Sequence, residues 1–112
     1  MGSLSQAHCR AIRPDEAGLN ETEISDFLNQ LNSSWKLKDN ARSIERTLSF
    51  NDFYETMSFV NAAAWIAHQQ DHHPEIQVSY KHCLISYTTH SINGLSLNDF
   101  ICAARINTIT DQ

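Results

Sequence analysis

The segment from residue 52 to residue 69 constrains the fold most, because it is the longest stretch of the chain with a regular apolar period. Apolar side chains recur there at intervals of three and four, which is the period of a helix. One stripe of this helix holds five apolar side chains: Phe53, Met57, Val60, Ala64 and Ala67. Four more widen the apolar side: Tyr54, Phe59, Trp65 and Ile66. Such an apolar helix is expected to be covered on more than one face, by a sheet and by a partner subunit, although packing in the core alone also explains each of these side chains.

Alternating apolar and polar residues on both sides of this helix predict two β-hairpins. The runs 35–38 and 43–50 precede the helix, and the runs 75–80 and 83–90 follow it. Turn-forming residues separate the two runs of the first pair. In the loop after the last run, Gly94 suits a left-handed backbone position.

Two further helices complete the pattern. Helical spacing recurs over residues 20–31, where Asn20 or Thr22 can cap the first turn. Ser96 can cap a final helix, with Asp99 at the fourth place of a capping-box pattern. The order helix, two strands, helix, two strands, helix predicts an α+β fold, with helices packed on a four-stranded antiparallel sheet.

The length of 112 residues suits one domain with its own core. Residues 1–19 are polar and predict an irregular N-terminal arm, and residues 20–112 predict a single domain. The longest apolar stretch, at 60–67, is too short to span a bilayer.

Charge and cysteine content limit the class of partner and the compartment. The net charge of −5 argues against direct binding to nucleic acid or to an anionic membrane, both of which favour a basic surface. The three cysteines are odd in number and lack CxxC spacing, which predicts reduced thiols and a cytoplasmic location.

Histidines gather directly after the long helix. His68, His72 and His73 fall within six residues, and His90 follows the next hairpin. The i,i+4 spacing of His68 and His72 is typical of zinc sites, but an HExxH motif and a nearby cysteine pair are both missing from the sequence. Exposure in a loop is the other plain interpretation. Against it, Pro74 restricts the backbone of His73.

The chemistry of these histidines favours proton transfer. Neutral imidazole accepts a proton and imidazolium donates one near pH 7. Neither a nucleophile motif nor a Gly-rich phosphate loop occurs in the sequence. The residues by themselves therefore indicate an acid–base enzyme that acts on an uncharged polar ligand.

The spacing of these residues resembles the pterin-4a-carbinolamine dehydratase family, also known as the dimerisation cofactor of a homeodomain transcription factor. The pattern begins with a polar residue at His68 and continues with the triplet His72-His73-Pro74, Tyr80, His90 and Asp99. The stretches "TTH" and "GLSLNDF" are similar as well, and the resemblance covers about residues 20–108. The N-terminal "LSQAHC" resembles the bacterial branch.

The resemblance implies dehydration of 4a-hydroxytetrahydrobiopterin to quinonoid dihydropterin, without a cofactor or a metal. This reaction recycles the pterin used by aromatic amino-acid hydroxylases. His72, His73 and His90 carry over as catalytic residues. We expect His72 and His90 to share the acid and base roles, and His73 mainly to hold the pterin.

Further positions carry over as substrate-binding residues. Besides His73 they are Tyr80, Thr88, Thr89, Ser91 and Asp99. Sheet packing explains Tyr80 equally well, and a role in the first turn of the final helix explains Asp99 equally well. His68 departs from the family pattern, in which many members carry Glu, and this puts a carboxylate contribution at that position in doubt.

The resemblance also leaves other functions open. Family members form homodimers or homotetramers, so we expect a homo-oligomer that binds a pterin substrate. A non-catalytic coactivator or assembly partner is the alternative function, and a metal-dependent enzyme is a third. All three motif histidines are present, which favours the enzyme, because a scaffold does not need them for packing.

Overall fold

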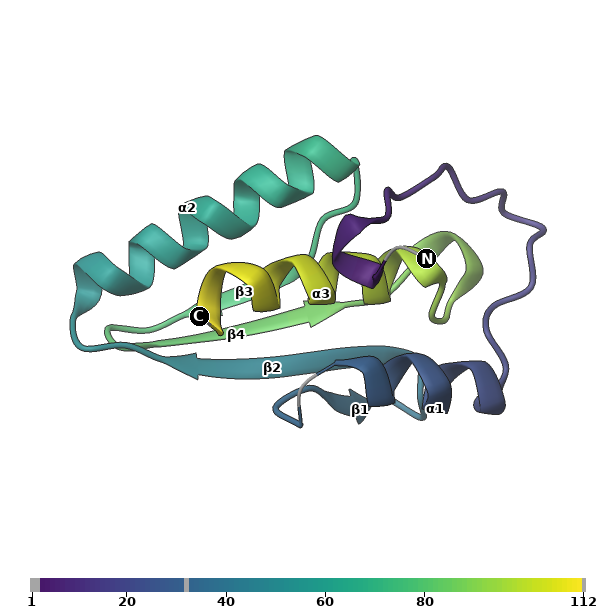
Figure 1. Ribbon diagram of the computed structural model, residues 1–112, viewed down its shortest axis with the longest axis horizontal. Helices are drawn as coiled ribbons and strands as arrows, with labels where there is room; N and C mark the ends of the chain where they lie inside the picture. Colours follow the sequence, from purple (N-terminus) through teal and green to yellow (C-terminus); the bar gives the residue numbers. More distant parts are fainter. Residues whose placement is uncertain (1–2, 32, 112) are drawn as a thin grey trace.

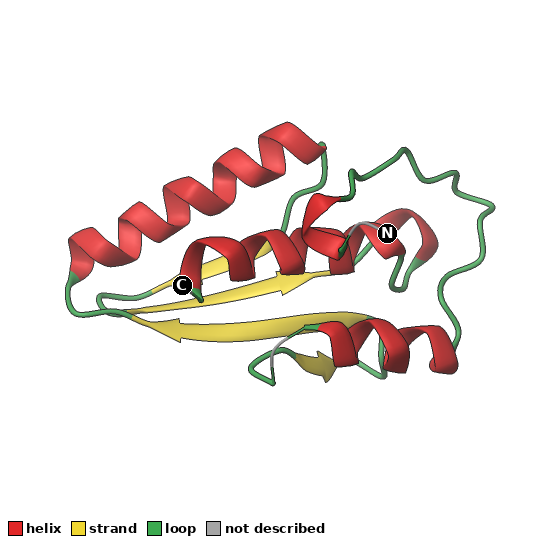
Figure 2. Ribbon diagram, viewed as in Figure 1, coloured by secondary structure: helices red, strands yellow, loops and turns green. Residues whose placement is uncertain are grey.

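The computed structural model describes residues 3–31 and 33–111, and it confirms the predicted α+β fold (Figures 1 and 2). The helices are α1 (Glu21–Gln30), α2 (Phe53–Gln70) and α3 (Leu97–Thr110), and the strands are β1 (Lys36–Lys38), β2 (Ser43–Ser49), β3 (Glu75–Val78) and β4 (His82–Tyr87). Two short 3-10 helices, η1 (Leu4–Gln6) and η2 (His90–Ile92), lie in the N-terminal arm and after β4.

The four strands form one antiparallel sheet in the order β1-β2-β4-β3. The predicted hairpins β1-β2 and β3-β4 are both present, and β2 pairs with β4 in the centre. Helices α2 and α3 lie side by side over the same face of the sheet (Figure 1). Strand β4 therefore lies beneath both helices, with Cys83, Ile85 and Tyr87 fully buried.

The helix starts follow the sequence. Asn20 caps α1 with a hydrogen bond from the Glu23 N–H at 2.9 Å, and Asp52 caps α2 with one from the Glu55 N–H at 2.8 Å. Side-chain acceptors at these positions satisfy backbone donors that the helix itself leaves unpaired.

The buried face of α2 differs from the predicted stripe. The helix buries Thr56, Phe59, Ala63, Ile66 and Gln70. The predicted stripe meets the core only in part: its Val60 is partly buried against the core, whereas its Phe53 is 41% exposed and its Ala64 is exposed. Apolar residues surround most of this helix, so their period could not select the face that meets the sheet.

The segment that follows β4 differs from the sequence-based expectation in two details. The left-handed position in the loop after β4 is Asn93, with φ 49°, while Gly94 pairs with Thr89 in an isolated bridge. Strand β4 ends at Tyr87, so His90 begins η2 and does not end a strand. Asn tolerates the left-handed region because its side chain bonds locally, which removes the need for glycine.

In the part of the chain that the structure describes, no helix combines the length and the apolarity needed to cross a membrane.

Candidate functional site

A cavity of about 290 Å³ lies where α2 ends and gathers the three predicted catalytic histidines. Its walls come from arm residues 10–12, residues 71–73 after α2, residues 88–91 around the start of η2, and Asn98 of α3. These segments are distant in the sequence, and the antiparallel β4 and the reversal after α2 bring them together. The volume is at the lower end of the roughly 300–1,000 Å³ typical of small-molecule sites.

His72 reaches this cavity because α2 stops just before it. Gln70 is the last helical residue, and Asp71 takes a left-handed conformation with φ 52°. The His72 N–H then donates to the Ala67 carbonyl at 3.3 Å, which closes the helix end. Pro74 follows two residues later and keeps the chain extended into β3.

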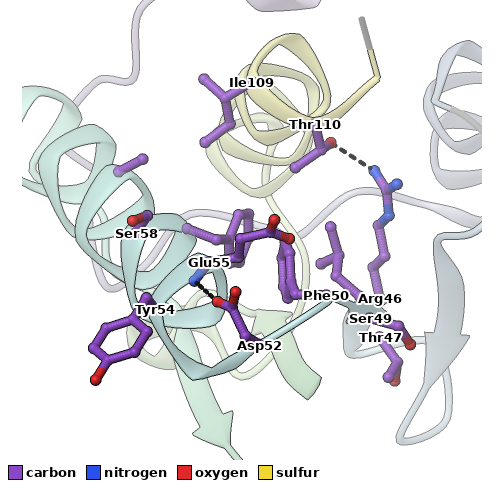
Figure 3. A pocket seen from close by; sticks show the side chains of 13 residues that line it. Arg46, Thr47, Ser49, Phe50, Asp52, Tyr54, Glu55, Ser58, Ile109 and Thr110 are labelled. Carbon is purple, nitrogen blue, oxygen red and sulfur yellow. Dashed lines mark hydrogen bonds between the residues drawn. The ribbon is translucent and has the colours of Figure 1, made fainter. Parts of the chain in front are cut away.

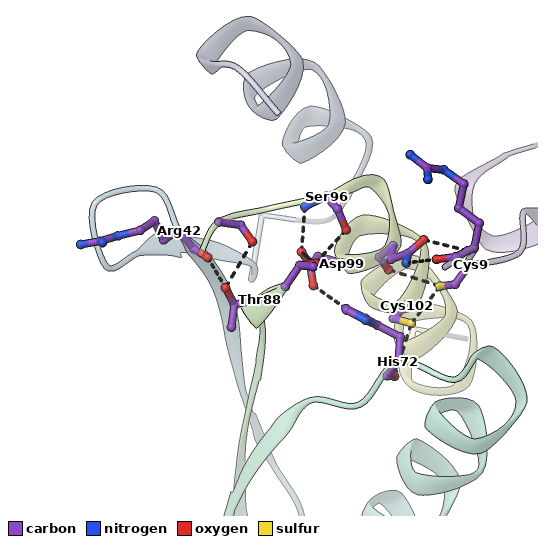
Figure 4. Close-up of polar contacts among 11 residues, drawn as sticks. Cys9, Arg42, His72, Thr88, Ser96, Asp99 and Cys102 are labelled. Atoms are coloured by element: carbon purple, nitrogen blue, oxygen red, sulfur yellow. Dashed lines mark hydrogen bonds and ion pairs between the residues drawn. The ribbon is translucent and has the colours of Figure 1, made fainter. Parts of the chain in front are cut away.

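A buried carboxylate holds the His72 ring. The Nε2–H of His72 donates to Asp99 Oδ1 at 2.6 Å, and the Asp99 side chain is fully buried (Figure 4). A short bond of this kind is typical of a charged acceptor. Since Nε2 is occupied, the other ring nitrogen, Nδ1, is the one left for a ligand.

The second oxygen of Asp99 is also fully used. Asp99 Oδ2 accepts hydrogen bonds from Thr89 Oγ1 at 2.8 Å and from the Ser96 N–H at 2.9 Å. Thr89 Oγ1 and Ser96 Oγ lie 2.8 Å apart. The predicted capping box of α3 is therefore present, and its carboxylate both caps the helix and orients a histidine.

Tyr87 supports the other side of the His72 ring. The two rings are stacked, with centroids 6.0 Å apart and an angle of 11° between their planes. Burial by itself lowers the pKa of His72, but the hydrogen bond to Asp99 and the negative charge of that carboxylate outweigh it. The pKa of His72 therefore lies above its ordinary value, which favours the imidazolium form.

His73 and His90 line the same cavity in a different environment. Both are exposed, His73 on the extended segment before β3 and His90 at the first position of η2. Ser91 is exposed next to His90. We call the part of the cavity lined by the partly buried, braced His72 the inner wall, and the part lined by the solvent-exposed His73 and His90 the outer wall.

The neighbouring threonines point in different directions. Thr88 donates a hydrogen bond to the Arg42 carbonyl and ties the site to the turn between β1 and β2. Thr89 is buried and donates to Asp99. Both line the cavity, but each hydroxyl proton already has an acceptor in the protein.

The N-terminal arm supplies a wall that sequence reasoning missed. The Asn98 side chain clamps Arg10, because its Oδ1 accepts from the Arg10 N–H at 3.1 Å and its Nδ2 donates to the Arg10 carbonyl at 2.7 Å. The Arg10 guanidinium pairs with both carboxylate oxygens of Glu16, at 2.9 and 2.7 Å. The one sequence signal for Asn98 was its position, two residues after the predicted cap Ser96 and therefore in the first turn of the final helix.

The cavity is not lined by three of the residues that the sequence pattern brought into consideration: Tyr80, Asp99 and His68. Among the described residues that line it, neither Tyr80 nor Asp99 is present. Tyr80 lies at the β3-β4 turn, 64% exposed and stacked on Phe53 with centroids 6.2 Å apart. His68 packs against the exposed Trp65, with ring centroids 5.2 Å apart and the ring planes tilted by 31°.

A larger cavity, of about 790 Å³, lies between β2, the start of α2 and the end of α3 (Figure 3). No histidine of the described chain lines it. Its charged groups already have structural roles: Asp52 caps α2, and Arg46 pairs with Asp111 at 2.8 Å. The smaller cavity is the better candidate because its histidines can transfer protons.

Within residues 3–31 and 33–111, no group of three or more His, Cys, Asp or Glu side chains has the arrangement of a metal site.

The profile of the family described as pterin 4 alpha carbinolamine dehydratase matches residues 17–109. The chain belongs to this family, which makes it an enzyme of the dehydratase type, a lyase. The match begins inside the arm and covers every element from α1 through α3 except the last residue of α3.

Bacterial relatives agree along almost the whole chain. A protein of Legionella pneumophila (strain Corby), assigned as a pterin-4-alpha-carbinolamine dehydratase, is 48% identical over 104 residues, which cover 93% of this chain and 92% of the relative. One of Nitrosomonas eutropha with the same assignment is 50% identical over 101 residues, and these cover 88% of each chain.

Solved structures share the fold. A transcriptional coactivator/pterin dehydratase from Brucella melitensis has a TM-score of 0.77 and 34% identity, over 82% of this chain and 97% of that chain. A pterin dehydratase-like protein described as a RuBisCO assembly factor in the alpha-carboxysome has a TM-score of 0.60 at 18% identity, over 70% and 90% of the chains. The second likeness concerns the fold alone.

Proposed function

We propose that this protein dehydrates 4a-hydroxytetrahydrobiopterin, the pterin-4a-carbinolamine, to quinonoid dihydropterin and water by histidine acid–base catalysis. The observation that carries the proposal is the meeting of His72, His73 and His90 at one cavity, with His72 braced by a buried carboxylate. The reaction would return the cofactor of aromatic amino-acid hydroxylases to its recycling route. Family membership and the assigned relatives support the substrate class.

In this proposal His72 is the general acid. Its raised pKa favours the protonated form, and Nε2 is held by Asp99, so Nδ1 carries the proton to be given away. Donation to the 4a-hydroxyl turns a poor leaving group into water as the C4a–O bond breaks. Asp99 stabilises the imidazolium beforehand and acts through His72 as a positioning residue.

His90 is the general base. It is exposed where it lines the cavity, in the short η2, and can accept the N5 proton of the substrate. The electrons of the N5–H bond then form the C4a=N5 bond, so one proton enters at oxygen and one leaves at nitrogen. Solvent returns both histidines to their starting states.

The remaining predicted positions have binding roles. We assign His73 and Ser91 to direct contact with the pterin, because both line the cavity and are exposed. Thr88 and Thr89 offer their hydroxyl oxygens as acceptors, since their protons are already donated. A contact from Tyr80 would need a second copy of the chain, because its ring lies at the β3-β4 turn.

The test is turnover of synthetic 4a-carbinolamine by wild type, three site variants and one control variant. His72→Ala and His90→Ala should each lower kcat about 10²-fold or more, the usual contribution of a general acid or base. His73→Ala should mainly raise KM. His82→Ala is the matched control, because His82 is exposed at the start of β4 and should leave turnover unchanged. Unchanged kcat in His90→Ala would refute its role as base.

A second candidate function is assembly, as a homodimer, a homotetramer or a coactivator-like partner. The specific observation is a set of exposed aromatic side chains on α2 and the β3-β4 turn: Phe53, Tyr54, Trp65 and Tyr80. Light scattering of wild type and Trp65→Glu is the measurement. A smaller mass for the variant supports assembly through α2, and a monomeric wild type refutes it.

A further inference from the structure

Two cysteines far apart in the sequence meet behind the candidate site. The Sγ atoms of Cys9, in the arm, and Cys102, in α3, lie 3.6 Å apart across 93 residues (Figure 4). Both are free thiols, as is Cys83. Cys102 Sγ also lies 3.9 Å from the His72 carbonyl oxygen, so this thiol pair contacts the segment that carries the general acid.

The two thiols differ in accessibility and in reactivity. Cys9 is half-buried, while Cys102 is fully buried. A hydrogen bond from Cys102 lowers the pKa of Cys9; burial opposes this shift, and the charge of His72 adds to it. The same contact and burial raise the pKa of Cys102. Cys9 is therefore the more acidic and more accessible of the two thiols and the one expected to react first, and Cys102 is the thiol that can resolve it.

We propose that Cys9 and Cys102 are a redox-sensitive modification site, which forms an intramolecular disulfide with a hydroperoxide and fastens the arm to α3. The Cys9 thiolate attacks the peroxide O–O bond, takes one oxygen as a sulfenic acid and releases a first water after protonation. The Cys102 thiol then displaces the hydroxyl of the sulfenic acid, which leaves as a second water. Two thiols and one hydrogen peroxide thus give one disulfide and two waters, and two electrons pass from sulfur to oxygen.

The surrounding contacts suit this reaction. A disulfide is about 2.05 Å long, so the two sulfur atoms must approach by roughly 1.5 Å. Cys9 lies in a segment without regular structure, where the backbone can adjust. Its N–H donates to Gln70 Oε1 at 2.8 Å, and the adjacent Arg10 is clamped by Asn98, so the arm stays in place for the reaction.

The disulfide would immobilise one wall of the candidate site. Arm residues 10–12 line the cavity directly after Cys9, and a covalent link at Cys9 restricts how far this wall can open. We expect slower exchange of substrate and product, and hence at least about a threefold loss of kcat/KM that a dithiol reductant reverses. This effect on turnover rests on the proposed dehydratase function, whereas formation of the disulfide does not.

The test is oxidation of the full chain with hydrogen peroxide, followed by alkylation of free thiols and trypsin digestion without reduction. Mass spectrometry should find peptide 1–10 linked to peptide 82–105, and dithiothreitol should release it. Peptide 82–105 contains both Cys83 and Cys102, so matched variants decide between them. The link should persist in Cys83→Ala and disappear in Cys102→Ala.

Thermal unfolding gives a second measurement, independent of turnover. Closing so long a loop restricts the unfolded chain, so oxidation should raise the Tm of wild type by at least about 5 °C. Cys9→Ala should show no rise. Three outcomes would each overturn the proposal. The link could survive in Cys102→Ala, it could form only between two chains, or peroxide treatment could leave all three thiols free. If the link forms but the protein does not turn over the carbinolamine, only the proposed function fails. If the link forms and oxidation leaves the turnover unchanged, the proposed control of the site through the arm fails.

Discussion

The two walls of the candidate site show how one cavity can combine rigid and adaptable groups. On the inner wall, His72 is held by Asp99 and stacked on Tyr87, and every polar atom of the Asp99 carboxylate has a partner. On the outer wall, His73 and His90 are exposed. The difference predicts that changes on the inner wall lower the stability of the fold, while changes on the outer wall affect the proposed chemistry with little effect on stability.

The largest expected effect tests the inner wall directly. Asp99→Ala removes the acceptor for His72, Thr89 and the Ser96 N–H together. We expect the free energy of unfolding to fall by about 2–4 kcal/mol, because buried donors lose their partner. Denaturant unfolding measures the change. Asp26→Ala, at an exposed position of α1, is the control, and an equal loss there would contradict the special role of Asp99.

The second effect is a pH dependence of stability. The pKa of His72 in the folded state lies above its ordinary value of about 6.5, so folding favours the protonated form. This contribution is fully present below the unfolded pKa and is lost as pH rises through the folded pKa. Stability of wild type should therefore decline over the range above pH 6.5, relative to Asp99→Asn.

Unfolding of both proteins between pH 6 and pH 9 measures this contribution. The amide of Asp99→Asn keeps the size of the side chain and removes its charge, so the pH-dependent part of the difference reports the ion pair with His72, while lost hydrogen bonds give a pH-independent offset. Parallel stability profiles for the two proteins would show that the ion pair does not set the pKa of His72.

A smaller effect is expected at Tyr87. Its hydroxyl is buried without a hydrogen-bond partner among the described residues, while its ring stacks on His72. Tyr87→Phe keeps the ring and removes an unsatisfied group, so the free energy of unfolding should rise by about 1 kcal/mol. Tyr80→Phe, at an exposed ring, should change nothing. A loss of stability in Tyr87→Phe would mean that the hydroxyl has a partner.

The smallest effect on stability belongs to the outer wall. His90→Ala should change the free energy of unfolding by less than about 0.5 kcal/mol, as is usual for exposed positions. Its expected loss of turnover would then be a loss of chemistry and not of fold. A large destabilisation would remove the contrast between the two walls.

Local features of the fold could be predicted because local physics controls them. The side chains of Asn20 and Asp52 accept backbone N–H groups of the next turn, and at the start of α3 the Asp99 carboxylate accepts the Ser96 N–H. The buried face of α2 could not be predicted in the same way. That face is set by contact with the sheet and α3, which leaves the apolar Phe53 and Ala64 exposed while α2 buries the polar Thr56 and Gln70.

The candidate site was predictable as a set of residues but not as an arrangement. The spacing of His72, His73 and His90 resembled a known family, and the structure brings all three to one cavity. The wall contributed by Arg10 and the clamp from Asn98 carry no periodic signal, because they join an irregular arm to a helix 88 residues away. Such long-range contacts depend on packing of the whole chain.

The sequence by itself determined the element order, the helix caps and the histidines available for proton transfer, since each depends on neighbours within a few residues. Only the tertiary structure decided that Asp99 braces His72 from a buried position and that Cys9 meets Cys102. It also decided that Tyr80 lies at a distant turn. The physical reason is that hydrogen bonds and sulfur contacts act over a few ångströms in space, whatever the separation along the chain.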